Sequence, residues 1–146
     1  MFRQLAAALF LLPCATLAAA PALAPGSWAI TSTTVAMSVP GLPRFMARMM
    51  EGKSKTHRKR LLAGHGMEAL IAPDPKERCH IDVQRVADGK YNQTLTCPQK
   101  RGQPVQVVRS GTYDGTGFVG RATVTGTTAK GSMRIVLNQR ATRVGD

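Results

Sequence analysis

The segment DGTGFVG, residues 114–120, contains the spacing GxGxxG, which holds a pyrophosphate in dinucleotide-binding enzymes. Such a site needs a strand before the glycines, a helix after them and an acidic residue about 20 positions further on. The residues after Gly120 are RATVTGTTAKG, which are rich in β-branched side chains and interrupted by glycine. We therefore predict a hairpin turn at Asp114 and Gly115, with Gly117 and Gly120 at the start of the next strand.

The acids and histidines show no spacing typical of an active site. The sequence has no GxSxG or HExxH, and its three histidines lie at unrelated positions. Cys79, His80 and Cys97 offer too few ligands at their spacing for a metal centre. We predict no catalytic, cofactor-binding or metal-binding residues, and we interpret the protein as non-enzymatic.

Positive charge is the strongest chemical feature of the composition. The chain has 20 Lys and Arg against 8 Asp and Glu, a formal net charge of +12. Five cations fall within eight residues, in a segment with no acid after Glu51. They are Lys53, Lys55, Arg58, Lys59 and Arg60. A mobile patch of this kind would attract anionic lipid headgroups or acidic glycans, and its alternative role is a solvated surface. No aromatic residue stands between the cations, so nucleic acid is not an expected partner.

The N-terminus is typical of a signal peptide. Arg3 and the α-amino group precede an apolar stretch at residues 5–12, and small residues follow. Cleavage after Ala22 is favoured because the neighbouring sites would place a proline just after the cut. An uncleaved membrane anchor is the alternative, but the stretch is rich in alanine and contains prolines. We predict a signal peptide over 1–22 and a single exported β domain over 23–146, periplasmic or secreted.

Export also defines the state of the cysteines. Cys14 would leave with the signal peptide, so Cys79 and Cys97 remain in an oxidising compartment. An even pair predicts one disulfide bond.

Residues 79–97 alternate apolar and polar side chains around ADG, which indicates an antiparallel hairpin. With a three-residue loop, Val86 pairs with Lys90 and Cys79 faces Cys97. A two-residue DG turn would instead set Cys79 opposite Pro98.

Further strands are predicted over 27–39, 104–113, 117–125 and 131–141. With the central hairpin they form a mainly β, single antiparallel meander sheet of about six strands, curled or half-barrel in shape. A Met- and Pro-rich segment and a basic loop, residues 51–66, are inserted after the first strand. Met46, Met49 and Met50 stand at helical spacing near 44–51, and we expect them to cover the core. The residues MEALI before Pro73 predict one more helical turn.

Several of these motifs together resemble a known family. PGSWAITSTTVAM is followed by PGLPRFMARMM, then CHIDVQRVADGKYNQTLTC, GTYDGTGFVGRATVTG and the closing RATRVGD. The sequence is similar to the proteobacterial exported domain-of-unknown-function family 3617 over nearly all of the chain after residue 22. The resemblance implies a periplasmic location and an antiparallel fold. It implies no activity and no site residue.

Three functions remain open from the sequence. The first is a non-enzymatic binding or structural protein of the cell envelope that holds an apolar or amphipathic small molecule between the sheet and the Met-rich segment. The second is an electrostatic binder of anionic envelope lipids or glycans through the basic loop. The third is an enzyme with a cleft that the spacing of residues does not reveal. The oligomeric state is not predicted.

Overall fold

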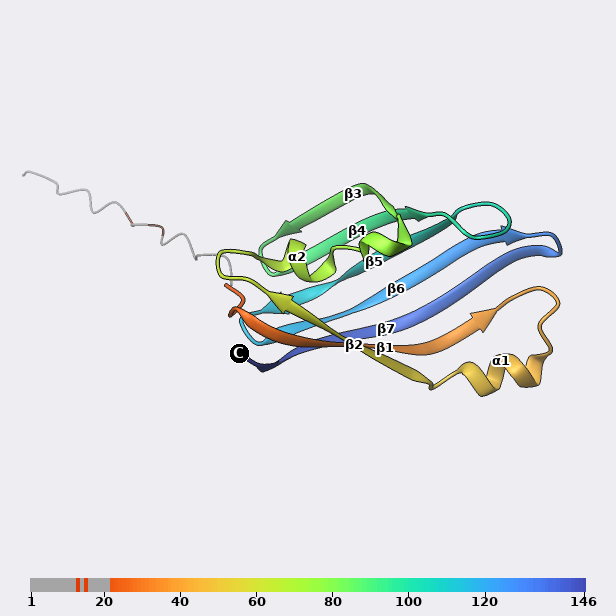
Figure 1. Ribbon diagram of the computed structural model, residues 1–146, viewed down its shortest axis with the longest axis horizontal. Coiled ribbons are helices and arrows are strands. Elements are labelled where there is room, and N and C mark those ends of the chain that lie inside the picture. Colours follow the sequence, from red (N-terminus) through yellow and green to blue (C-terminus); the bar gives the residue numbers. More distant parts are fainter. Residues whose placement is uncertain (1–12, 14, 16–21) are drawn as a thin grey trace, which may run out of the picture.

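One open, antiparallel sheet of seven strands forms the body of the protein (Figure 1). The computed structural model describes residues 13, 15 and 22–146, so the predicted signal peptide lies almost entirely outside the described residues. The strands are β1 (Gly26–Ser38), β2 (Ser54–Leu61), β3 (His80–Ala87), β4 (Lys90–Cys97), β5 (Val105–Asp114), β6 (Gly117–Thr128) and β7 (Gly131–Gly145). Their order is β2-β1-β7-β6-β5-β4-β3. The predicted mainly β, single-sheet fold is confirmed.

The connections explain how one face of the sheet becomes covered. Strands β3 to β7 form a meander, whereas β1 lies between β7 and β2. Strands β2 and β3, which follow each other in sequence, therefore stand at opposite edges. The chain between them must cross one face, and it does so as helix α2 (Met67–Ile71) and the short 3-10 helix η1 (Pro75–Glu77) (Figure 1). We call the face that they cross the inner face.

The core lies between α2 and the inner face. Met67, Leu70 and Ile71 are the buried residues of α2. They pack in one cluster with Leu23, which precedes β1, and with sheet residues that include Trp28, Ile30, Leu61, Tyr91, Phe118 and Ala141. The indole of the fully buried Trp28 donates a hydrogen bond to the carbonyl of Ala24 at 3.1 Å. The chain entering β1 thus closes one end of the core.

The basic segment is not the loop that the sequence predicted. Residues Ser54–Leu61 form the edge strand β2, paired with β1 from Gly26 opposite Leu61 to Thr33 opposite Ser54. Only Leu61 of this strand is buried. An edge strand needs no alternating apolar residues when only its end reaches the core, so the period-two signal was missing.

Helix α1 (Arg44–Met50) forms where the methionine spacing predicted it, but its position is different from the one expected. None of its residues is buried, and Phe45 and Met49 are 65% and 63% exposed. The methionines therefore do not cover the core. The core is covered by α2, the second helical segment predicted from the sequence.

The central hairpin reaches the predicted cysteine pairing by a different register. Its turn has two residues, with positive φ at Asp88 (53°) and Gly89 (72°), so Ala87 pairs with Lys90. The predicted Val86–Lys90 pair was wrong. A bulge between Ile81 and Val83 adds one residue to β3 and corrects the offset. Cys79 and Cys97 then lie with their Cα atoms 4.1 Å apart and form the predicted disulfide bond.

Candidate binding site

The inner face carries rows of side chains that run across the strands, since residues opposite each other in a ladder point to the same side. The row under α2 is mainly apolar and contains Tyr113, Phe118, Ala141 and Ile30. The next two rows contain the polar residues Ser32, Gln84, Gln93, Arg109 and Gln139. The fourth row is apolar across six strands and contains Ile81, Leu95, Val107, Val124, Ile135 and Met37.

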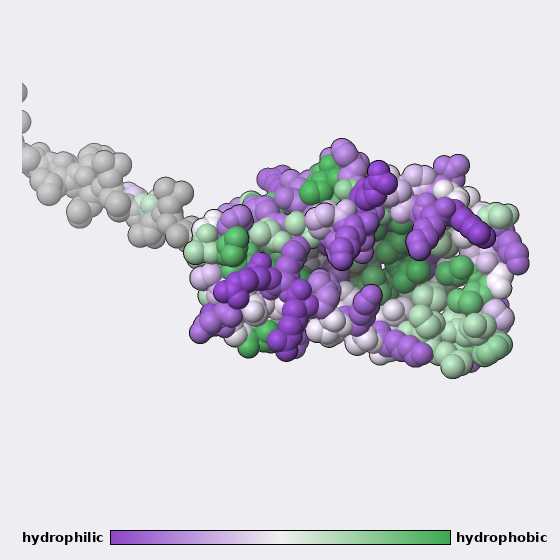
Figure 2. Space-filling view, in the orientation of Figure 1, coloured by the Kyte–Doolittle hydropathy of each residue, from purple (hydrophilic) through white to green (hydrophobic). Residues whose placement is uncertain are grey.

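The fourth row is not fully covered. Of its members only Leu95 is buried, and Ile81 is 40% exposed. Figure 2 shows a hollow in the middle of this face with hydrophobic side chains at its bottom and hydrophilic ones around it. The face thus passes from a closed core, through a polar band, to an open apolar floor.

Two cations of the sheet hold the crossing segment in place. The ammonium of Lys59 donates to the carbonyls of Ala72 at 2.6 Å and Leu70 at 3.3 Å. The guanidinium of Arg109 donates to the carbonyl of Ile71 at 3.2 Å. The last carbonyls of a helix have no partner within the helix, so these contacts satisfy the end of α2.

A cavity of about 390 Å³ lies between residues 70–77 and the inner face. Its apolar lining includes Ile30, Phe118 and Leu137, and its polar lining includes Gln139 and Arg109. Small-molecule sites usually measure roughly 300–1,000 Å³ and combine an apolar wall with a few polar groups. We call this cavity, with the adjoining apolar fourth row, the groove.

The groove is electropositive. Burial lowers the pKa of Arg109, and burial followed by the charge of Arg109 lowers the pKa of Lys59. The pKa of His57 is lowered by burial and then by the charges of Lys59 and Arg109. The carboxylates of Asp74 and Glu77 act in the opposite direction. Both carboxylates line the cavity without forming an ion pair in the described chain, so they offset part of its positive charge, and the lining cations Lys55, Arg58 and Arg109 outnumber them.

Three buried polar atoms beside the groove have no hydrogen-bond partner among residues 22–146: Tyr91 Oη, Gln93 Oε1 and Arg109 Nε. The amide of Gln93 donates to Gln84 Oε1 at 2.7 Å, and Gln93 lies opposite Arg109 in the ladder. Unpaired buried polar atoms are costly and uncommon in folded proteins. A polar ligand or water that reached Arg109 and Gln93 would satisfy two of them.

Strand β2 places the cations of the predicted anion-binding patch on opposite sides of the sheet. Lys55 and Lys59 lie on the inner face with His57, because their ladder partners Ser32 and Trp28 do. Arg58 and Arg60 alternate to the other side of the strand, although Arg58 still lines the edge of the cavity with Lys55. Lys53 precedes the strand and donates no charge to the groove. The structure therefore does not bring the five residues together, and anion binding by them stays a prediction.

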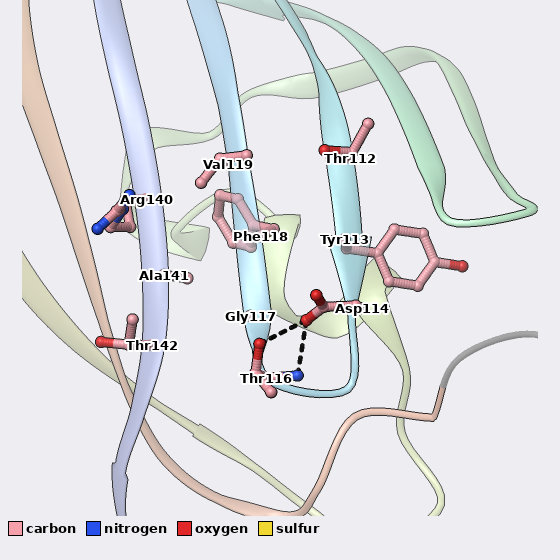
Figure 3. Close-up of a pocket in the computed structure, with 10 residues that line it drawn as sticks. All are labelled: Thr112, Tyr113, Asp114, Thr116, Gly117, Phe118, Val119, Arg140, Ala141 and Thr142. Atoms are coloured by element: carbon pink, nitrogen blue, oxygen red, sulfur yellow. Dashed lines mark hydrogen bonds between the residues drawn. The ribbon is translucent and has the colours of Figure 1, made fainter.

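The GxGxxG segment forms the β5–β6 hairpin, as predicted (Figure 3). Asp114 Oδ1 accepts hydrogen bonds from the backbone N–H of Thr116 at 2.8 Å and from its hydroxyl at 2.6 Å. These bonds lower the pKa of the Asp114 carboxyl. Gly120 lies on the inner face, against the Tyr91 hydroxyl. The glycines therefore serve a turn and a close side-chain approach, and the shallow pocket beside them is built from turn and strand residues.

The remaining candidate ligands are separate. His80 contacts Asp82 at 2.9 Å on the exposed edge strand β3. Within the described residues, no three His, Cys, Asp or Glu side chains gather in the way a metal site requires.

Fold and site together define a single-sheet β protein with an open electropositive groove beneath a crossing helix. The family model of the protein of unknown function DUF3617 matches residues 23–146, and the chain belongs to this family. Neither the curated proteins nor the solved structures contain a significant match.

Sequence reasoning did not select Arg109, Gln93 or Gln139 as functional residues. A signal was present for Arg109. In VQVVRSGTYD it occupies the same alternating positions as Val105, Val107 and Tyr113, which makes it a single cation in an otherwise inward-facing series.

Proposed function

We propose that the protein is a non-enzymatic binding protein of the cell envelope that holds an anionic amphipathic small molecule in the groove. The observation that carries this proposal is the position of Arg109. Its partly desolvated guanidinium lies between the cavity under α2 and the open apolar fourth row. A carboxylate or phosphate headgroup would bind beside Arg109, and an alkyl chain would lie along Leu137, Val124 and Ile135.

The chemistry of the groove supports an anion over a neutral or cationic ligand. The charge of Arg109 lowers the pKa of both Lys59 and His57, and a bound anion would relieve this repulsion. The headgroup would also give the free Nε of Arg109 an acceptor. The tail would remove partly exposed Val and Ile side chains from water, at about 25 cal/mol for each Å² covered.

Isothermal titration calorimetry with three 12-carbon probes tests this proposal: dodecanoate, dodecanol and dodecyltrimethylammonium, each below its micelle concentration. We expect dodecanoate to bind at one site and the cationic probe to bind at least about tenfold more weakly. Equal binding of all three, or no binding of dodecanoate, would contradict the proposal.

Two variants locate the site. Arg109→Gln removes the headgroup contact, and Val124→Glu places a carboxylate in the path of the tail. Each should weaken dodecanoate binding by about tenfold or more, which corresponds to about 1.4 kcal/mol. Arg121→Gln is the matched control, because Arg121 is an exposed cation on the outer face of β6. Thermal unfolding of each variant shows whether the fold is retained.

The location of the protein is part of the same proposal. Leu23, the first residue after the predicted cleavage, is buried in the core, and Ala24 bonds to Trp28, which supports a domain that begins there. N-terminal sequencing of protein from the periplasm should begin at Leu23. Retention of Met1 in a membrane fraction would contradict export with cleavage.

A further inference from the structure

Helix α1 has an exposed apolar side that the fold itself does not require. At about 100° per residue, Phe45, Met46, Met49 and Met50 fall on one side of the helix. Their exposed fractions are 65%, 43%, 63% and 42%. Ala47, which is partly buried, falls on the side toward the sheet. Adjacent large apolar side chains left in water usually mark a surface that contacts another hydrophobic phase.

The helix is fixed firmly to the sheet. The N–H of Gly52 donates to the carbonyl of Thr34 at 2.7 Å, and the N–H of Thr34 donates to the carbonyl of Lys53 at 3.0 Å. These bonds join the chain after α1 to β1. Figure 1 shows α1 beyond the end of β2, and Figure 2 shows a hydrophobic area at the same corner of the molecule. The apolar side of α1 is therefore presented at one end of the protein.

Most charges near this apolar side are positive. Arg48, which is exposed, lies along one border of it, Arg44 lies further round the helix, and residues 44–50 contain no acid. Glu51, an exposed acid, follows the helix directly, and Lys53 comes two residues after it. The side chain of Lys130, from the β6–β7 turn, lies against Gly41 just before α1. An apolar side bordered by cations complements a bilayer surface that contains anionic lipids, where each cation near the surface contributes favourably.

We propose that α1 docks the protein onto anionic membranes by inserting its apolar side into the interfacial region, with Arg48 and the nearby Lys130 at the headgroups. The contact would be peripheral. Among the described residues no helix is long and apolar enough to cross a membrane. This surface is separate from the groove, so either one can function without the other. It also differs from the five-cation patch that the sequence predicted in a loop, because its main contribution is apolar.

The test is co-sedimentation with vesicles of phosphatidylcholine alone or with phosphatidylglycerol added. The protein used is residues 23–146, which contain every described helix and strand and the whole family match. We expect binding to the anionic vesicles and little to the neutral ones. Phe45→Ser with Met49→Ser should lower the partition coefficient by about tenfold or more, because two apolar side chains no longer enter the lipid. Both residues are exposed, so the fold should not depend on them.

Two control variants separate this proposal from its alternatives. Leu62→Ser removes an apolar residue that is 58% exposed outside α1, and it should leave binding unchanged. Arg58→Gln with Arg60→Gln neutralises the outer cations of β2 and should weaken binding less than the α1 double variant. Size-exclusion chromatography reports whether α1 instead joins two copies of the chain. The proposal is overturned if the wild type does not bind anionic vesicles, if the α1 variant binds equally, or if that variant dissociates a dimer.

Discussion

Among single residues, Arg109 has the most unusual surroundings. Its guanidinium bonds the end of α2, its Nε has no partner within the described residues, and it faces the buried Gln93 across the ladder. One side chain thus links the covered and the open parts of the inner face. The other basic side chains of this face are Arg143, opposite Trp28, and Lys55, His57 and Lys59 of the edge strand β2. This arrangement makes Arg109 the central headgroup contact of the proposed ligand.

Gly120 tests the structural interpretation of the GxGxxG segment. A Cβ atom at this position would collide with the Tyr91 hydroxyl and the Ser110 carbonyl oxygen. We expect Gly120→Ala to lower the free energy of unfolding by roughly 1–3 kcal/mol, the usual cost of overpacking. Denaturant unfolding measures this. Gly145→Ala is the control, because nothing lies within 4 Å of its added Cβ. Equal stability of both variants would show that the close approach at Gly120 is unimportant.

Asp82, the extra residue of the bulge, should titrate below the ordinary range of an aspartate. Hydrogen bonds from the Thr96 hydroxyl at 2.6 Å and from His80 lower the pKa of its carboxyl. A depressed pKa in the folded state stabilises the fold above the unfolded pKa of about 3.9, and the effect is lost as pH falls through the folded pKa. NMR titration should show Thr96→Val raising the pKa of Asp82. Thr112→Val, an exposed site on β5, should not change it.

Among the elements, the edge strand β2 combines two functions that the sequence does not separate. Its inward-facing cations support the crossing segment, and its outward-facing cations meet solvent. The face to which each cation of β2 points therefore decides its role more than the number of cations in the strand does. Because neighbouring cations of β2 point to opposite faces, this strand provides both a test variant and its matched control.

Lys59 and Arg60 are that pair. Lys59→Gln removes the ammonium that bonds Leu70 and Ala72, and we expect it to lower the free energy of unfolding by about 1–2 kcal/mol. Arg60→Gln, on the outer face, should change it by less than about 0.5 kcal/mol. Thermal or denaturant unfolding compares the two. Similar losses from both would mean that β2 does not hold α2 in the way described.

The disulfide bond should stabilise β3, the edge strand at which the meander begins. Strand β3 pairs only with β4, and all its residues except Val86 are exposed. Changing both Cys79 and Cys97 to Ala frees a loop with a sequence separation of 18. We expect a loss of about 3 kcal/mol in denaturant unfolding. A reduced wild type that is as stable as the oxidised one would contradict this.

For the whole molecule, the alternation of apolar and polar side chains was sufficient to predict the sheet wherever strands bury one face, as in β4 to β7. It failed at β2, because an edge strand with one buried residue carries no apolar period. Helical spacing predicted α1 but not its exposure, since a short amphipathic stretch fits a core and a lipid surface equally well. The hairpin register depended on a bulge at Asp82, which no local residue pattern signals.

The groove could not be predicted for a different reason. The residues of its cavity come from β1, β2, β5, β6 and β7 and from the crossing segment, and they meet only because β2 and β3 stand at opposite edges. That strand order follows from pairing β1 with β7, whose paired residues are 96 to 118 positions apart. Single-sequence patterns describe neighbours along the chain, and they do not contain this pairing.

Groove and helix α1 suggest one arrangement for the molecule. A carrier of anionic amphipaths must exchange its ligand with a membrane, and α1 would hold the protein at a bilayer surface while the groove is loaded. The groove is the central claim, because it rests on side chains from most of the fold.

The most direct test of that claim is a two-dimensional ¹H–¹⁵N NMR titration of residues 23–146 with dodecanoate. We predict saturable shifts at the amides of Val107, Arg109 and Val124, on the inner face, with Arg121 on the outer face little changed. No shift at saturating dodecanoate, or shifts confined to the outer face or to α1, would contradict ligand binding in the groove.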